Sequence, residues 1–299
     1  MSVQAYHPSA ASWQPPGGIV AVDLGNTAAK VLISDALAGI RPFGSDHVSP
    51  LSRSFAIDAG PWTDEAIDWV RQHAPAVHQW RLASVNRGAA SRLQSDILKR
   101  FPGADVLRVV HDRVPVTSDL AAPQRIGIDR LLCAFAAGLA DPGPPQRATT
   151  LVDAGSAVTV DFLDDQGIFR GGAILPGLNL QARSLATGTD LLPQIDWISE
   201  TSLQSPGKDT VAAIRLGILS GVAGAIDRLA TRYGTDRVLI TGGDATAIAP
   251  HLSVRHRVCH DMVGVGILAC RCWSPSESAS GPTDPPPDPA DATPSQRHC

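Results

Sequence analysis

The feature that most constrains this fold is a short segment that occurs in both halves of the 299-residue chain. Residues 19–35 read IVAVDLGNTAAKVLISD, and residues 150–164 read TLVDAGSAVTVDFLD. In each segment an aspartate, Asp23 or Asp153, ends an apolar strand, a glycine two residues later permits a tight turn, and a second strand follows. A duplicated unit of this kind predicts two similar domains that face each other.

Helical and strand patterns follow each unit, in the mixed order that is typical of an α/β fold. Apolar periodicity predicts helices over residues 64–73, 89–101, 126–140, 178–186 and 209–233, the last closed by Gly234. Further strands are expected over residues 80–85, 104–110, 168–175 and 238–240.

A proline-rich segment, residues 141–145, interrupts the chain between the two units. We therefore predict an N-terminal domain over residues 17–144 and a C-terminal domain over residues 145–273. Residues 274–299 are rich in Pro, Ser and Asp and are predicted to be disordered, as are residues 1–16.

Composition argues against nucleic acid and membranes as partners. The formal net charge is −4, and no run of Lys and Arg suggests a nucleic-acid surface. No stretch holds the roughly 18–20 apolar residues of a membrane helix, and the N-terminus lacks a secretory pattern, so we expect a cytoplasmic protein. The five cysteines match neither a disulfide framework nor a zinc motif, which predicts free thiols in a reducing compartment.

The first turn, from Asp23 to Thr27, carries groups that phosphoryl transfer requires. That reaction needs amides and hydroxyls around the phosphates and a carboxylate that holds Mg²⁺. Gly25 lets the backbone approach a phosphate, and Asn26 adds a short polar side chain. Lys30, on the next strand, would offset phosphate charge. The same residues also fit an ordinary hairpin, so the turn alone leaves both interpretations open.

The second turn repeats this combination of a carboxylate and hydroxyls, through Asp153, Ser156 and Thr159. Alternation along the strand places Asp161 on the same face as Thr159. Carboxylates at two facing turns would form a site for a cation and phosphates between the domains. For Asp161 the alternative is a solvated strand position.

A third candidate is the sequence Gly127-Ile128-Asp129-Arg130, at the start of an apolar helix. Charges near a buried helix need partners, so Asp129 would accept a proton from a substrate hydroxyl and Arg130 would bind a substrate anion. The alternative is a capping acid followed by a surface cation.

Taken in order, these motifs resemble those of the type III pantothenate kinases over about residues 19–272. The shared motifs are Asp-x-Gly-Asn-Thr (23–27), Gly-x-Asp-Arg (127–130), Asp-x-Gly-Thr-Ala-x-Thr-x-Asp (153–161), Gly-Gly-x-Ile-x-Pro-Gly (171–177), a Gly-Lys-Asn-Thr-like helix start (207–217) and Thr-Gly-Gly (241–243). The resemblance implies the actin-like ATPase fold, in which two ribonuclease-H-like α/β domains enclose an interdomain cleft.

It also implies a function: ATP-dependent phosphorylation of pantothenate to 4'-phosphopantothenate, the first step of coenzyme A biosynthesis, by a homodimer. Asp129 would be the general base, Asp153 would ligate a monovalent cation (K⁺ or NH₄⁺), and Asp23 would hold Mg²⁺ with ATP. The implied ATP and phosphate ligands are Asp23, Leu24, Gly25, Asn26, Thr27, Ala28, Ala29, Lys30 and Ser156. The implied pantothenate ligands are Gly127, Ile128, Asp129, Arg130 and Thr189.

The chain departs from the family pattern mainly around the acceptor. Ser156 and Asp209 replace Thr and Asn conservatively. Three further departures lie near the implied acceptor pocket, where relatives have Tyr, Asn and Ala: Leu120, Ala122 and Asp190. A kinase for another small hydroxylated substrate is therefore one alternative. A non-catalytic accessory or regulatory relative is another, although such a protein has no need of a base at Asp129.

Overall fold

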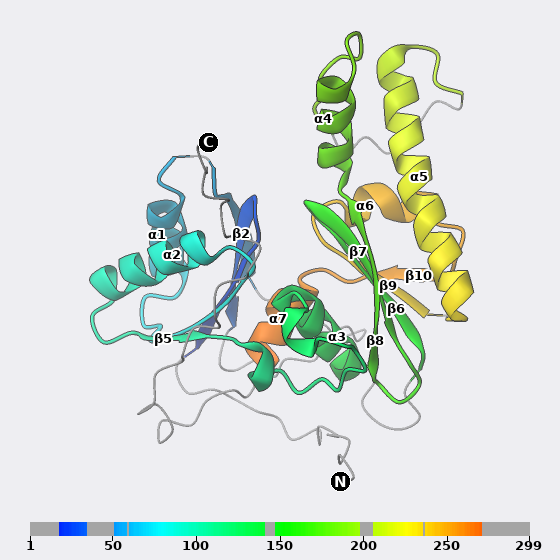
Figure 1. Cartoon of the computed structure of the whole chain (residues 1–299). Helices are drawn as coiled ribbons and strands as arrows, with labels where there is room; N and C mark the ends of the chain where they lie inside the picture. Colours follow the sequence, from blue (N-terminus) through cyan, green and yellow to red (C-terminus); the bar gives the residue numbers. More distant parts are fainter. Residues whose placement is uncertain are drawn as a thin grey trace, which may run out of the picture.

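The computed structural model describes residues 18–34, 51–58, 60–140, 147–197, 206–235 and 237–270. These residues form two separate five-stranded mixed sheets with helices packed against them (Figure 1). The ends predicted to be disordered and most of the proposed domain boundary lie outside the described residues, so the domain limits stay predictions.

Sheet A comes from the first half of the chain and has the strand order β3-β2-β1-β4-β5. Strands β1, β2 and β3 are antiparallel neighbours, while β4 and β5 run parallel to β1. The strands are β1 (Ile19–Leu24), β2 (Ala28–Ser34), β3 (Leu51–Ala56), β4 (Gln79–Ser84) and β5 (Asp105–Arg108). Helices α1 (Trp62–His73) and α2 (Arg87–Arg100) share an apolar core with one face of this sheet.

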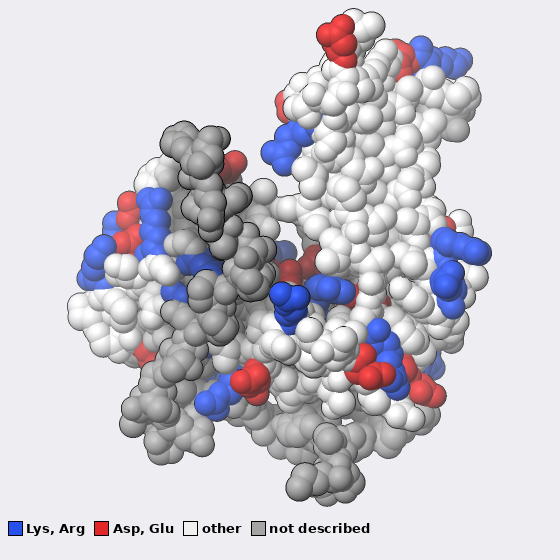
Figure 2. All heavy atoms as spheres, in the orientation of Figure 1, with Lys and Arg blue, Asp and Glu red and all other residues white. Residues whose placement is uncertain are grey.

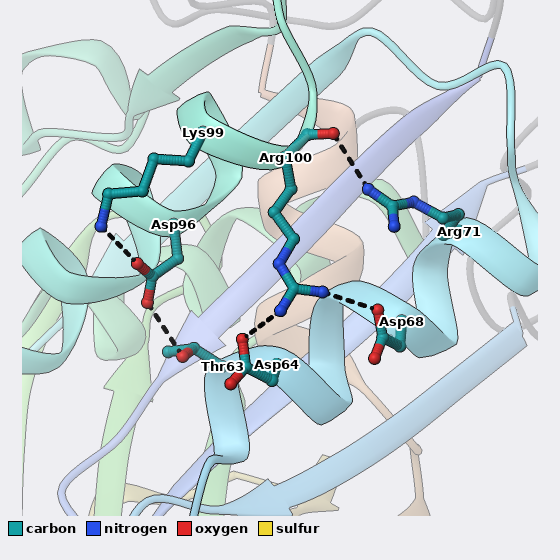
Figure 3. Close-up of polar contacts among 7 residues, drawn as sticks. All are labelled: Thr63, Asp64, Asp68, Arg71, Asp96, Lys99 and Arg100. Carbon is teal, nitrogen blue, oxygen red and sulfur yellow. Dashed lines mark hydrogen bonds and ion pairs between the residues drawn. The ribbon is translucent and has the colours of Figure 1, made fainter.

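Polar contacts also join α1 to α2 (Figure 3). The guanidinium of Arg100, at the end of α2, contacts the carboxylates of Asp64 and Asp68 on α1 at 2.6 and 2.9 Å. In return, Arg71 of α1 donates to the backbone carbonyl of Arg100 at 3.0 Å. These exposed contacts add little to the apolar core, which holds the helix pair on the face of sheet A.

Sheet B comes from the second half and has the same topology, in the order β8-β7-β6-β9-β10. The strands are β6 (Thr149–Ala154), β7 (Ala157–Leu163), β8 (Phe169–Pro176), β9 (Arg237–Thr241) and β10 (His256–Val258). Three helices pack beside it: α4 (Leu178–Gly188), α5 (Thr210–Tyr233) and α6 (Ala245–Ile248). The duplication expected from the two aspartate turns is confirmed, because both turns join the first two strands of the same arrangement.

Helices α3 (Ile128–Ala140) and α7 (Met262–Ala269) lie between the two sheets (Figure 1). They share one buried cluster with residues of both sheets, among them Ile19 of β1 and Leu151 of β6. Because helices cover both faces, β1 and β6 are buried almost throughout and read as continuous apolar runs.

Every expected helix and strand is present, with its ends within two residues of the prediction. Helix α5 begins after Asp209, whose carboxylate accepts from the amide of Ala212, and Gly234 caps it in the left-handed conformation that was expected. Among the described residues, the α-helices and strands that were not predicted are β3, α6, β10 and α7, and three short 3₁₀ helices were not predicted either. Strand β3 has mostly exposed polar residues, and α7 is apolar all round, so neither has a one-sided periodicity.

The expectation that no segment resembles a membrane span is wrong for α5. By length and composition this helix could cross a membrane. A single helix of this kind is weak evidence, because core helices of soluble proteins pass the same test. One face of α5 packs in the core beside sheet B, through Ile218, Val222 and Ile226.

The expectation of free thiols holds for two cysteines and is wrong for a third. Cys133 and Cys259 are buried and free. Cys270, which follows α7, is disulfide-bonded. A count of cysteines could not predict this, because bonding depends on which sulfur atoms the fold brings together.

Candidate active site

The turns after β1 and β6 occupy equivalent places in the two sheets and meet each other, although the first turn is one residue longer. The amide of Gly25 donates to the carbonyl of Ala28 at 3.0 Å, and that of Gly155 donates to the carbonyl of Ala157 at 2.9 Å. The hydroxyl oxygens of Thr27 and Ser156, 129 residues apart in the chain, lie 2.7 Å from each other. The fold thus brings the two predicted phosphate turns into direct contact.

Asp23 and Asp153, at the ends of β1 and β6, lie close enough for the charge of Asp153 to raise the pKa of Asp23. Burial, followed by the charges of Asp153 and Asp129, raises the pKa of Asp23 to about 8. Burial, followed by the charge of Asp129, raises the pKa of Asp153 to about 6. Lys30 opposes both shifts. Figure 2 shows a hollow near the centre of this face of the molecule, with acidic atoms in its depth and basic side chains beside it.

Asp129 lies in the first turn of α3, beside this pair of carboxylates. Its Oδ1 atom accepts from the amide of Arg130 at 2.9 Å, which is the local contact expected of an acid at a helix start. The same oxygen occupies the space that a Cβ atom at position 127 would need, so Gly127 is required for this placement. Asp129 therefore makes a local helix-start contact and also lies within electrostatic reach of both turns.

The alternatives of a solvated Asp161 and a surface Arg130 are wrong. Asp161 is 2% exposed, and its two carboxylate oxygens accept from the Nε atom of Arg130 at 3.1 and 3.0 Å, with a further contact from Nη2. The guanidinium also lies over the ring of Phe169, 5.6 Å from its centroid. Helix α3, rather than water, covers the face of β7 that carries Asp161. The alternation along the strand predicted on which face Asp161 lies, but not that a helix covers that face.

Lys30 lies directly opposite Asp23 in the β1–β2 ladder, so both side chains project from the same face of sheet A. Its ammonium also forms an ion pair with Asp261, the residue just before α7. Sequence reasoning missed Asp261, because it belongs to none of the recognised motifs and follows a strand of only three residues.

The turn Thr241-Gly242-Gly243 lies against the end of β6. Gly242 has a φ of +97°, and a Cβ atom there would collide with the backbone of Ala154. The amide of Asp244 donates to the carbonyl of Ala154 at 2.9 Å. Burial raises the pKa of Asp244 to about 6. This Thr-Gly-Gly motif is thus fixed beside the second phosphate turn.

Within one chain, Thr189 lies away from the other predicted site residues. It is the exposed C-cap of α4, and its hydroxyl donates to the carbonyl of Leu185 at 2.7 Å. Helix α4 projects away from sheet B, with its C-terminal end far from α3 (Figure 1). Leu120, one of the departures from the family pattern, packs against Gly171 of β8.

Two sheets of the same topology, joined by carboxylate and hydroxyl turns that meet at one hollow, define a phosphotransferase of the actin-like ATPase fold. A solved structure from Campylobacter jejuni, described as a conserved Baf family transcriptional activator, has this fold. It aligns over 83% of this chain and 95% of its own, with 19% identity and a TM-score of 0.51.

Sequence comparison identifies the family. The model of the type III pantothenate kinase family matches residues 19–232. A type III pantothenate kinase of Rhodopirellula baltica is 40% identical over 250 residues, which are 78% of this chain and 90% of that protein. One of Dechloromonas aromatica is 35% identical over 251 residues, 82% of this chain and 94% of its own. The chain therefore belongs to the type III pantothenate kinase family, whose members are ATP-using enzymes of coenzyme A biosynthesis.

Proposed function

We propose that this chain transfers the γ-phosphoryl group of ATP to the 4'-hydroxyl of pantothenate in the hollow between the two sheets. The observation that carries this assignment is the convergence of three segments, the turns after β1 and β6 and the start of α3, on one group of carboxylates. Phosphoryl transfer needs positioned phosphates and a carboxylate beside the acceptor hydroxyl, and these segments supply both.

The phosphates of ATP would be held by the turn of residues 23–30 and by Ser156. The hydroxyls of Thr27 and Ser156 bond to each other, so both turns present a hydroxyl at the same point of the site. A phosphate oxygen that replaced this mutual contact would bridge the two halves. The turn of residues 241–243 is the candidate for the nucleoside, since Gly242 packs it against the end of β6 and no atom lies within 4 Å of the Cβ position of Gly243.

Asp23 and Asp153 suit cations. Both are desolvated carboxylates whose ionisation is disfavoured, and hard oxygen donors are the ligands that Mg²⁺ and K⁺ prefer. We assign Mg²⁺, bound with ATP, to Asp23 and a monovalent cation to Asp153. Among the residues that the structure describes, no group of three or more His, Cys, Asp or Glu side chains could hold a metal ion, so we assign the remaining ligands to phosphate oxygens and water. The metal, when bound, neutralises charge on the phosphates.

Asp129 would accept the proton of the pantothenate hydroxyl as the phosphoryl group is transferred. Its Oδ1 atom is fixed by the amide of Arg130, which holds the carboxylate at the helix start. A positioned general base of this kind is worth about 10²- to 10⁴-fold in rate.

Arg130 would bind the carboxylate of pantothenate. Its Nε and Nη2 atoms contact Asp161, while Nη1 takes no part in that pair and is the atom assigned to the acceptor. Because the guanidinium is fixed by a bidentate pair and an aromatic ring, it would present this donor in one orientation.

We also propose a cytoplasmic homodimer. Large apolar side chains are exposed on β8 and around α4, namely Ile174, Leu180 and Leu191. Exposed apolar surface of this kind is typical of an interaction site. Thr189, which lies far from Asp129 in its own chain, would then contact pantothenate in the site of the second copy.

The test is ADP release coupled to a reporter enzyme, with pantothenate as acceptor, with and without K⁺. We expect ADP release that depends on pantothenate and rises with K⁺. Asp129→Asn should reduce turnover at least about 100-fold while melting temperature and ATP affinity stay close to those of the unchanged enzyme. Asp68→Asn, at an exposed carboxylate on α1, is the matched control and should keep full turnover.

Two results would reject parts of this assignment. A folded Asp129→Asn enzyme with most of its turnover would remove the base. ADP release that responds to other small hydroxylated compounds but not to pantothenate would favour a different acceptor, in keeping with the altered residues Leu120, Ala122 and Asp190.

A further inference from the structure

We propose, on the basis of the phosphate role of Lys30 proposed above, that Asp261 is a positioning residue that holds the Lys30 ammonium at the phosphate site. Asp261 lies outside every motif considered so far. It contacts sheet A from the segment that leads out of sheet B, and its partners are the side chains of Lys30 and Ser52.

Both carboxylate oxygens of Asp261 have a partner on sheet A. Oδ1 forms the ion pair with the Nζ atom of Lys30 on β2, and Oδ2 accepts from the hydroxyl of Ser52 on β3 at 3.0 Å. The Asp261 side chain is 7% exposed, whereas that of Lys30 is 31% exposed. The carboxylate is therefore a buried acceptor held from two strands, and the lysine is the more exposed member of the pair.

The backbone around Asp261 is also fixed, in an unusual conformation. With a φ of 62°, Asp261 is the only non-glycine residue in the left-handed region among the described residues. The segment is tied to sheet B, because the amide of Cys259 donates to the carbonyl of Ile240, and that of Met262 donates to the hydroxyl of Thr241. A non-glycine residue kept in this region is often part of a functional site, and Asp tolerates the conformation better than most residues.

Lys30 contacts Asp261 and also lies within electrostatic reach of the carboxylates of the two phosphate turns. It faces Asp23 across the β1–β2 ladder, and its charge lowers the pKa of both Asp23 and Asp153. Three carboxylates thus compete for one ammonium. Without the charge of Asp261, the ammonium would pair with Asp23 and Asp153 instead and would no longer be held in the position from which it contacts a phosphate.

The test is a double-mutant cycle on the KM for ATP, with Asp261→Asn, Lys30→Met and the double variant. Asparagine keeps the size, the acceptor for Ser52 and the tolerance of positive φ, and removes only the charge. We expect Asp261→Asn to raise the KM for ATP about tenfold, the loss of one charge-assisted contact. The double variant should have the same KM as Lys30→Met alone, because residues that act through one another are not additive.

Each other outcome has a defined meaning. An unchanged KM for ATP in folded Asp261→Asn, or an equal increase in both backgrounds, would overturn the positioning role and leave the phosphate site intact. An unchanged KM in Lys30→Met would overturn both the positioning role and the phosphate role of Lys30.

Asp261→Gly separates positioning from a purely structural role. Glycine relieves the positive φ and removes the carboxylate, so the KM for ATP should rise as in Asp261→Asn while the melting temperature does not fall further. A structural role predicts the opposite: a lower melting temperature with a normal KM in the folded fraction. Asp68→Asn, the exposed control, should change neither quantity.

Discussion

At the scale of single residues, the carboxylates of Asp23 and Asp153 are held where ionisation costs more than it does in water. Motif spacing predicted that both would end buried strands beside glycine turns. It could not predict how close they would lie, because that distance depends on how the two sheets pack. Asp161 illustrates the same limit, since its strand position was predicted and its buried ion pair with Arg130 was not.

The raised pKa values predict how stability depends on pH in the enzyme without metal or nucleotide. The folded state keeps a proton on Asp23 up to about pH 8, whereas an unfolded Asp loses it near its ordinary value of 3.8. The folded state therefore binds more protons in this interval, and stability falls as pH rises through it, by at most about 1.4 kcal/mol per pH unit. Asp153 contributes in the same direction up to about pH 6.

Between pH 6 and 8 the effect of Asp23 should dominate. We expect the melting temperature to fall by roughly 5 °C over this interval and Asp23→Asn to remove most of that fall, because asparagine does not titrate. The measurement is thermal unfolding in EDTA across the pH range, with Asp68→Asn as the control. Parallel curves for Asp23→Asn and the unchanged chain would show that the pKa of Asp23 is not raised in this way.

The ion pair of Arg130 and Asp161 predicts a large loss of stability when one partner is removed. Asp161→Asn leaves the guanidinium of Arg130 buried without its counter-charge, which typically costs about 3 to 5 kcal/mol. Urea unfolding measures this loss. Asp119→Asn removes a carboxylate from an exposed pair with Arg170 and should have a much smaller effect. Equal effects of the two substitutions would contradict the burial of the Arg130 pair.

At the scale of elements, periodicity predicted the helices that have one apolar face and failed where a helix is covered on every side. Helix α7 contains Gly264 and Gly266, which lower its helical propensity, and it has no polar face to mark its period. The structure shows why glycine is needed at both positions: a larger residue would collide with its neighbours. A Cβ atom on Gly264 would meet the side chain of Leu32, and one on Gly266 would meet the backbone of Leu132.

These contacts predict opposite effects for two substitutions that have the same helical propensity. Gly266→Ala should destabilise the fold by at least about 1 kcal/mol despite the better helix former, because the backbone of α3 cannot move aside easily. Gly224→Ala, in α5, places its methyl group where no atom lies within 4 Å and should stabilise by up to about 1 kcal/mol. Urea unfolding of both variants measures the difference. Stabilisation by Gly266→Ala would contradict the close packing of α3 against α7.

At the scale of the whole molecule, the duplicated turn predicted two similar halves because each copy sits at the centre of its own sheet. Local pattern gave no sign that α7, at the end of the described chain, returns to sheet A, since that contact joins residues far apart in sequence. The position of Thr189 was the least predictable part of the site. The motif order placed it among the acceptor ligands, yet in one chain it lies at the end of a projecting helix.

That separation leads to the prediction that acceptor binding requires the dimer. Leu191→Asp places a charge on a side chain that is 88% exposed, two residues after Thr189, and should produce monomers in sedimentation experiments. If Thr189 contacts pantothenate in the second copy, these monomers should have a KM for pantothenate raised at least about tenfold with an unchanged affinity for ATP. Leu98→Asp changes an exposed leucine of α2, on the half that carries sheet A, and is the matched control that should stay dimeric and fully active. Monomers of Leu191→Asp with a normal KM for pantothenate would show that each chain binds its acceptor alone, and Thr189 would then have no place in the site.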